Sequence, residues 1–215
     1  MKRKALVCLP VLCCLFNASC TPPGPAEETI LLYVRSQDVY REGRFAEAAL
    51  MLAGEAKFVP AMVLRGKAEY LSGDLKAAEK SLKRALALGP ENSEASLFLA
   101  RLFRETGKQI EAQKLAEKIL SGNPQDIRAL RFAAELARDR GASGEAASAI
   151  FLDRAVEASS EAAMVFLDRA RLRWAGGNGC GALEDLGRAR VLLFRDSPVL
   201  KAVETLESII SEVSS

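Results

Sequence analysis

The chain has 215 residues, of which 49% are apolar and 27% are charged, and its formal net charge is +2. Such a composition fits an ordinary folded protein, and the near-neutral balance gives no reason to expect nucleic acid as a partner. The sequence contains no histidine. Because histidine is the commonest general base and the commonest transition-metal ligand, we expect no enzyme activity, no metal and no other cofactor.

Residues 1–19 have the layout of a signal peptide. Three basic residues, Lys2 to Lys4, precede an apolar run from Ala5 to Phe16. A helix of that length rises roughly 18 Å, which is too short for a hydrocarbon core about 30 Å thick. We therefore expect an export signal and not a transmembrane helix.

The signal ends in Asn17-Ala18-Ser19-Cys20, which resembles the lipobox of bacterial lipoproteins. Ala18 and Ser19 match that pattern, whereas Asn17 stands where the family prefers an apolar residue. The resemblance implies that Cys20 carries acyl chains such as palmitate and that the mature chain faces the periplasm. Thr21 is not the aspartate that retains some lipoproteins in the inner membrane, which favours the outer membrane. The alternative is ordinary signal cleavage that leaves Cys20 as a free thiol.

Residues 20–28 contain three prolines and a glycine, so we expect an extended tether between the lipid and the folded part. Beyond Cys20 the chain has one cysteine, Cys180, and an acylated Cys20 would leave no possible intramolecular disulfide. Loss of the signal leaves 27 basic and 28 acidic side chains. A protein so close to neutral is not expected to bind a membrane surface by charge.

A pattern of glycine, alanine and proline repeats at an interval of 34 residues. It consists of the pairs Gly73 and Gly107, Ala78 and Ala112, and Pro90 and Pro124. This period resembles that of the tetratricopeptide repeat (TPR), a helix-turn-helix unit that stacks on copies of itself. The resemblance implies an all-α, right-handed TPR-like helical-hairpin solenoid with a C-terminal capping helix. An irregular all-α bundle is the alternative.

We expect about five TPR-like repeats over residues 29–195, followed by a capping helix and tail over residues 196–215. The glycines expected at the turns between paired helices are Gly43, Gly73, Gly107, Gly141 and Gly177. In repeat four Ala146 is in register as the small residue where two helices cross. Repeat five is expected from about Ala163, and an apolar pattern from Leu200 to Val213 predicts the closing helix, which a solenoid needs to cover its last repeat.

The segment Gly177-Asn178-Gly179-Cys180-Gly181-Ala182 matches a dinucleotide-binding fingerprint. That fingerprint has physical meaning only after a β-strand, and helical sequence precedes it here. We therefore interpret the segment as the turn of repeat five. Cys180 has no histidine to activate it as a nucleophile.

In TPR proteins the first helix of each repeat lines a concave groove. The resemblance implies that a protein or peptide partner binds there. Carried onto this chain, the positions include Tyr33, Tyr40, Lys67, Tyr70, Arg101, Arg104, Arg131, Arg138, Arg171 and Trp174. A solvated face of arginine–glutamate pairs is the alternative interpretation of these side chains.

The sequence thus predicts a non-catalytic, lipid-anchored scaffold of the bacterial envelope that mediates protein–protein interaction, such as the assembly of envelope complexes. A periplasmic ligand-binding subunit that works with a transporter is the alternative from a different functional class. An enzyme is disfavoured by the absence of histidine.

Overall fold

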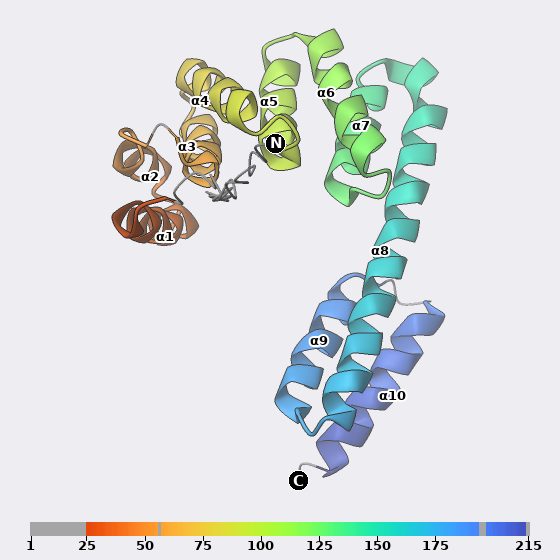
Figure 1. The fold of residues 1–215 in the computed structure, drawn as a ribbon. Coiled ribbons are helices and arrows are strands. Elements are labelled where there is room, and N and C mark those ends of the chain that lie inside the picture. The colour runs from red at the N-terminus through yellow and green to blue at the C-terminus, as the bar shows by residue number, and fades with distance from the viewer. Residues whose placement is uncertain (1–24, 56, 194–196, 214–215) are drawn as a thin grey trace, which may run out of the picture.

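The computed structural model describes residues 25–55, 57–193 and 197–213. These residues form ten α-helices and one short 3₁₀ helix, and the described chain contains no strand. Figure 1 shows α1 to α7 in an arc, from whose end α8 runs to a second group formed with α9 and α10. The predicted all-α, right-handed TPR-like solenoid with a capping helix is confirmed.

The arc is built of antiparallel helix pairs, with α4 and α6 on its outer side (Figure 1). Its helices are α1 (Glu27–Arg41), α2 (Phe45–Met51), α3 (Val59–Leu71), α4 (Leu75–Leu88), α5 (Ser93–Glu105), α6 (Gln109–Gly122) and α7 (Ile127–Arg138). After α7 come the 3₁₀ helix η1 (Gly141–Gly144), α8 (Glu145–Ala175), α9 (Gly179–Val191) and α10 (Pro198–Val213). Helix α1 begins inside the segment that the sequence assigned to the tether.

All five glycines predicted at the turns have a positive φ, between 69° and 89°. Glycine adopts this left-handed conformation without the steric cost that a Cβ atom brings. Two of the helices that follow these turns, α4 and α9, begin with a capped end: the side chains of Asp74 and Asn178 accept hydrogen bonds from the backbone N–H groups of Ala77 and Gly181. Helices α4 and α6 end shortly before Pro90 and Pro124, as the repeat predicts.

Small residues bring the paired helices of a repeat close together. A Cβ atom at Gly66 of α3 would lie 2.7 Å from Cγ of Leu82 in α4. Ala78 and Ala112, predicted at helix crossings, are fully buried. These contacts belong to a continuous core that runs from α3 to α7.

Repeat four departs from the predicted register. Ala146 is exposed, and Gly144 takes the close approach instead, since a Cβ atom there would lie 1.8 Å from the carbonyl oxygen of Ala137. The physical reason is η1, which inserts a turn of 3₁₀ helix before α8 and shifts the residues that face α7.

Helix α8 is continuous for 31 residues and contains the point, near Ala163, at which repeat five was expected to begin. Its sequence has no glycine or proline, so nothing stops the helix where a proline stops α4 and α6. Its buried residues advance by three, four or seven positions except for one step of five, from Ala158 to Ala163. A step of five rotates the buried side by about 140° relative to a whole turn.

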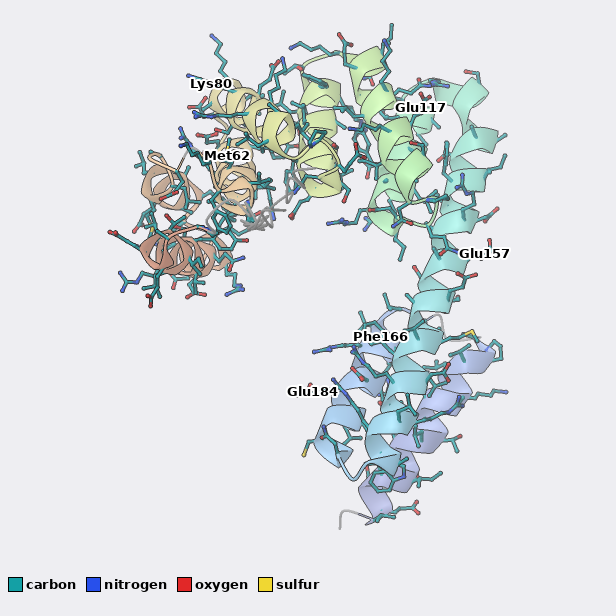
Figure 2. All side chains as sticks on the ribbon, in the orientation of Figure 1. Met62, Lys80, Glu117, Glu157, Phe166 and Glu184 are labelled. Atoms are coloured by element: carbon teal, nitrogen blue, oxygen red, sulfur yellow. The ribbon has the colours of Figure 1, made fainter. Side chains whose placement is uncertain are left out.

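The two halves of α8 therefore pack on different partners. The first half packs against α7, and the second half forms a separate core with α9 and α10. Glu157 marks the stretch of α8 between the two groups of helices in Figure 2. We call α1 to α7 with the first half of α8 the N-terminal array, and the second half of α8 with α9 and α10 the C-terminal unit.

Candidate partner-binding groove

Helices α1, α3, α5 and α7, the first helices of four repeats, carry eight of the ten predicted groove residues. These are Tyr33, Tyr40, Lys67, Tyr70, Arg101, Arg104, Arg131 and Arg138. Contacts between side chains of successive helices link most of them into one surface. The contacts also divide this surface into an aromatic end on α1 and α3 and an arginine end on α5 and α7.

At the aromatic end the Lys67 ammonium group is held by three neighbours. Its Nζ atom lies 2.6 Å from a carboxylate oxygen of Glu94. It also lies 5.2 Å from the ring centroid of Tyr40 and 5.3 Å from that of Phe98, within the range of cation–π attraction. Lys67 is therefore committed to contacts within the chain and is a poor candidate for binding a partner.

Tyr33 lines a cavity of about 310 Å³ between α1, α3 and the start of α5. Its ring packs edge-on against Phe58, with centroids 5.4 Å apart, and its hydroxyl oxygen accepts a hydrogen bond of 2.9 Å from Nε2 of Gln37. Burial, and then the negative charge of Glu94, raise the pKa of Tyr33. The tyrosine therefore stays neutral and offers a hydroxyl group to a ligand.

Tyr70 joins α3 to α5. Its hydroxyl group donates to Oε1 of Glu105, and its ring packs edge-on against Phe98 with centroids 5.8 Å apart. Burial, followed by the hydrogen bond to Glu105, raises the pKa of Tyr70 to about 12. The guanidinium carbon of Arg101 lies 5.3 Å from the centroid of the same Phe98 ring.

Phe98 lies among the predicted groove residues but was not itself predicted from the sequence. It lies on α5 one turn after Glu94 and one turn before Arg101, so the helical spacing of these two charged residues could have found it. Its ring contacts Lys67, Tyr70 and Arg101, and it thus organises the middle of the groove surface.

Arg104 bridges two first helices. Its Nη1 atom lies 2.8 Å from Glu135, and its Nε and Nη2 atoms lie 2.6 Å and 2.9 Å from the two carboxylate oxygens of Asp139. These hydrogen bonds lower the pKa of Asp139. Arg104 is therefore paired with carboxylates of its own chain, as the alternative interpretation of these side chains expects.

Arg131 and Arg138 differ from Arg104 because neither forms an ion pair with a carboxylate of the described residues. Both are exposed on α7, and no carboxylate of the described residues lies within ion-pair distance of either. Arg101 likewise has no ion pair there, and its guanidinium group stacks on Phe98. Three guanidinium groups along α5 and α7 thus keep free hydrogen-bond donors.

Arg171 and Trp174 lie in the C-terminal unit, apart from the other eight residues. Arg171 pairs with Asp168 at 2.9 Å on the surface of α8. The Trp174 ring packs into the second core, where a Cβ atom built on Gly179 would lie 3.5 Å from it. Trp174 is therefore partly buried against the second core, apart from the eight predicted groove residues of the N-terminal array.

The other predicted features of the chain are two cysteines, Cys20 and Cys180. Cys20, the predicted lipid attachment point, lies outside the described residues. Cys180 is an exposed free thiol at the start of α9, after the Gly177 turn. In the described part of the chain, no group of three acidic or cysteine side chains is placed to hold a metal ion, and no helix has the length and apolar character to cross a bilayer.

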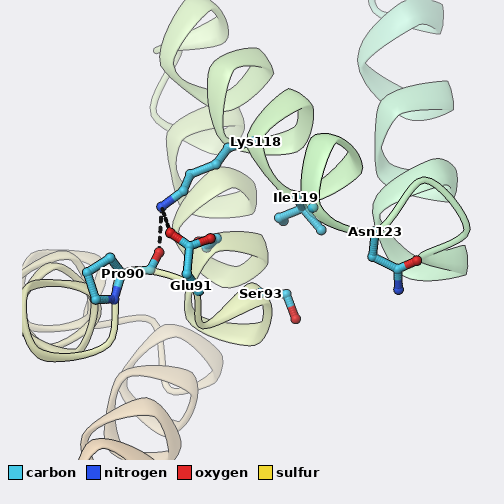
Figure 3. Close-up of a pocket in the computed structure, with 8 residues that line it drawn as sticks. Pro90, Glu91, Ser93, Lys118, Ile119 and Asn123 are labelled. Carbon is cyan, nitrogen blue, oxygen red and sulfur yellow. Dashed lines mark hydrogen bonds and ion pairs between the residues drawn. The ribbon is translucent and has the colours of Figure 1, made fainter.

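A further cavity of about 260 Å³ lies between the loop after α4 and the end of α6 (Figure 3). Lys118 closes one side by donating to the backbone oxygen of Pro90 and pairing with Glu91 at 3.3 Å. The remaining lining includes Ser93, Ile119 and Asn123. No set of converging titratable groups that could carry out a reaction is present among these residues.

The geometry defines the class of protein as a helical-hairpin solenoid. Residues 70–136 match the family model of the tetratricopeptide repeat. The central part of the N-terminal array is therefore similar to the tetratricopeptide repeat. No curated protein matched the chain.

Solved structures of TPR proteins share the fold. TTC0263, a thermophilic TPR protein of Thermus thermophilus, has a TM-score of 0.54 at 15% identity, over 84% of this chain and 98% of that one. A MamA fragment of Desulfovibrio magneticus has a TM-score of 0.52 at 20% identity, over 79% and 97%. A second MamA structure gives 0.54 at 21% identity, over 60% and 77%. At these identities the likeness shows the fold alone.

Proposed function

We propose that this chain is a non-catalytic, lipid-anchored scaffold of the bacterial envelope that binds an acidic segment of a partner protein in its groove. The observation that carries the proposal is the contrast between Arg104, whose donors are used within the chain, and Arg101, Arg131 and Arg138, whose donors are not. Arginine presents planar, paired donors that match carboxylates.

The aromatic end supports a partner with an apolar anchor beside its acidic residues. Tyr33 and its cavity supply a ring edge and a hydroxyl group, and Phe98 supplies an apolar face in the middle of the surface. An extended or helical peptide that runs along the first helices could place acidic side chains at Arg131 and Arg138 and an apolar one near Tyr33.

The lipid anchor and envelope location rest on the sequence of the first twenty residues. Two or more acyl chains on Cys20 would give lasting membrane attachment, since each buried methylene group contributes about 0.8 kcal/mol. A Cys20→Ser chain should move from the detergent phase to the aqueous phase on phase separation. Unchanged partitioning would exclude acylation at this residue.

The groove proposal is tested with a charge reversal. Arg101→Glu with Arg131→Glu should remove capture of the partner from cross-linked, solubilised envelopes, because two free donors become repelling carboxylates. Arg84→Glu is the matched control, since Arg84 is an exposed arginine on α4, a helix of the outer side. All variants should keep the parent's helical content and Tm, because exposed charges contribute little to stability.

Partner capture that survives the double reversal would contradict the groove proposal, and so would an equal loss of capture in the Arg84→Glu control. A small molecule that copurifies with the chain, with no protein partner, would instead support the transporter-associated ligand-binding subunit. Turnover of any substrate by the purified chain would contradict the non-catalytic assignment.

A further inference from the structure

One face of the C-terminal unit is open where the same face of repeats two, three and four is covered. Twelve residues before the turn glycine, α3, α5 and α7 carry Ala61, Ala95 and Ala129, and all three are 0% exposed. The equivalent residue of α8 is Val165, which is 68% exposed. The position is buried in the earlier repeats because it packs against the repeat before it.

A second position on the same face repeats the contrast. Five residues before the turn glycine, Ala68, Leu102 and Leu136 are at most 6% exposed, whereas Leu172 of α8 is 74% exposed. The face is open because α8 is continuous: where a separate second helix would precede the unit, the chain has only the first half of α8 itself. We call Val165, Leu172 and their neighbours the open face of α8.

Arginines border this open face on the side of α9. Arg169, Arg173 and Arg188 all contact the carboxylate of Asp185, which is fully buried beneath them. The contacts measure 2.6 Å, 3.0 Å and 3.4 Å. Glu184 also lies 4.0 Å from Arg188, so two carboxylates face the three guanidinium groups and the border keeps one excess positive charge. Asp168, which lies between Val165 and Leu172 in the sequence, is paired with Arg171 at 2.9 Å.

A helix of matching character, α10, lies in the same C-terminal unit. Helix α10 packs on α8 and α9 through Val203 and Ile210, but Ile209 is 45% exposed and Val213 is 70% exposed. Its charged residues are Lys201 and three glutamates, of which Glu207 pairs with Arg190 of α9, whereas Glu204 and Glu212 are exposed. Glu212 lies three residues after Ile209 and therefore beside the exposed apolar residues. The outward side of α10 is thus both apolar and acidic.

We infer that the chain binds a second copy of itself head to tail, with the outward side of α10 of one copy on the open face of α8 of the next. Ile209 and Val213 would cover Val165 and Leu172, and Glu204 and Glu212 would meet the arginine border. The open side of α1 is a poorer receptor for α10. It also exposes apolar residues, Leu31 and Val34, but it begins with Glu27 and Glu28, which would repel an acidic helix.

The two contacting surfaces differ, so this association is heterologous and leads to open chains or rings instead of a closed symmetric dimer. It does not involve the groove and stands independently of the proposed function. Opposite charges at the rim of a contact are screened by salt. We therefore expect self-association that grows with protein concentration and weakens as salt is raised.

The experiment is sedimentation velocity on the purified chain and on two blocked variants. Val165→Glu with Leu172→Glu blocks the open face of α8, and Ile209→Glu with Val213→Glu blocks α10. All four side chains are exposed, so circular dichroism should show that both variants fold as the parent does. Each variant alone should be monomeric at concentrations where the parent associates, with a Kd raised at least about tenfold.

Mixing the two variants gives the decisive result. Each retains the surface that the other lacks, so an equimolar mixture should form a complex of two chains and no larger species. A parent chain that stays monomeric at all concentrations would overturn the inference. So would an α10 variant that still dimerises, since that result would mean that the open face of α8 binds itself or another surface.

Discussion

The N-terminal array and the C-terminal unit are both built of helical hairpins, but they differ in how the faces of these hairpins are covered. In the array α3, α5 and α7 are each covered by the preceding repeat, and one core passes from α3 to α7. In the unit the corresponding face is open, and the position that carries Ala133 in α7 carries Arg169, which reaches to the buried Asp185. A continuous helix therefore interrupts the stacking of a solenoid, because no separate second helix remains to cover the next first helix.

The largest expected effect concerns the separation of the two cores. Leu102 and Leu186 are both fully buried, one in each core. Replacing either by alanine should lower the free energy of unfolding by about 2–5 kcal/mol. Hydrogen exchange should show that Leu102→Ala loosens mainly α3 to α7, and Leu186→Ala mainly α9 and α10. Equal loosening of both regions by either change would mean that they form one cooperative core.

The next largest effect concerns the ion pairs of the two regions. Asp185→Ala would leave three arginines crowded together with no carboxylate, and we expect Tm to fall by roughly 5 °C or more, with early loss of α9 and α10. Asp139→Ala removes a carboxylate that is only partly buried between α5 and α7. Thermal melts should therefore show a smaller change for Asp139→Ala than for Asp185→Ala. The reverse order would contradict the structural role given to Asp185.

The smallest effect is a dependence on acid pH. Hydrogen bonds from Arg169 lower the pKa of Asp185 below its ordinary value of 3.8. A lowered pKa in the folded state contributes stability that is present above that ordinary value and is lost as pH falls through the folded-state pKa. Asp185→Asn should therefore reduce the loss of Tm between about pH 4 and pH 2. Asp168→Asn, in an exposed pair with Arg171, serves as the control. An unchanged acid dependence in Asp185→Asn would exclude Asp185 as its source.

Much of the fold could be predicted because glycine and proline residues mark the turns of each repeat. A glycine at a position that needs positive φ and a proline after a helix act locally, so Gly73, Gly107, Pro90 and Pro124 determined the ends of helices without knowledge of the rest. The fusion of repeats four and five could have been predicted from the absence of glycine and proline between Glu145 and Ala175. The register shift at Gly144 could not, because it depends on how α7 and α8 pack.

The positions of the groove residues could be predicted from the sequence, but their ion-pair partners could not. Helical spacing places Lys67, Arg104 and Arg131 on one surface, yet only the approach of neighbouring helices decides which of them is paired. Lys67 and Arg104 meet carboxylates of the next repeat, and Arg131 meets none among the described residues. Trp174 is partly buried against the second core, which α8 forms with α9 and α10, and it lies apart from the groove positions on α1 to α7.

The continuity of α8 is the central claim, because it sets both the division into two regions and the open face. It is tested by measuring the distance between two spin labels in a chain that begins at Thr21. One label is placed on Cys180, then the only cysteine, and the other on Arg84→Cys in the array. We predict one narrow distance distribution that Ser160→Ala leaves unchanged. Ser160→Pro should broaden it, since a proline inside a helix removes a backbone hydrogen bond and kinks or breaks the helix. A broad distribution in the parent chain, unaffected by proline, would contradict a continuous α8.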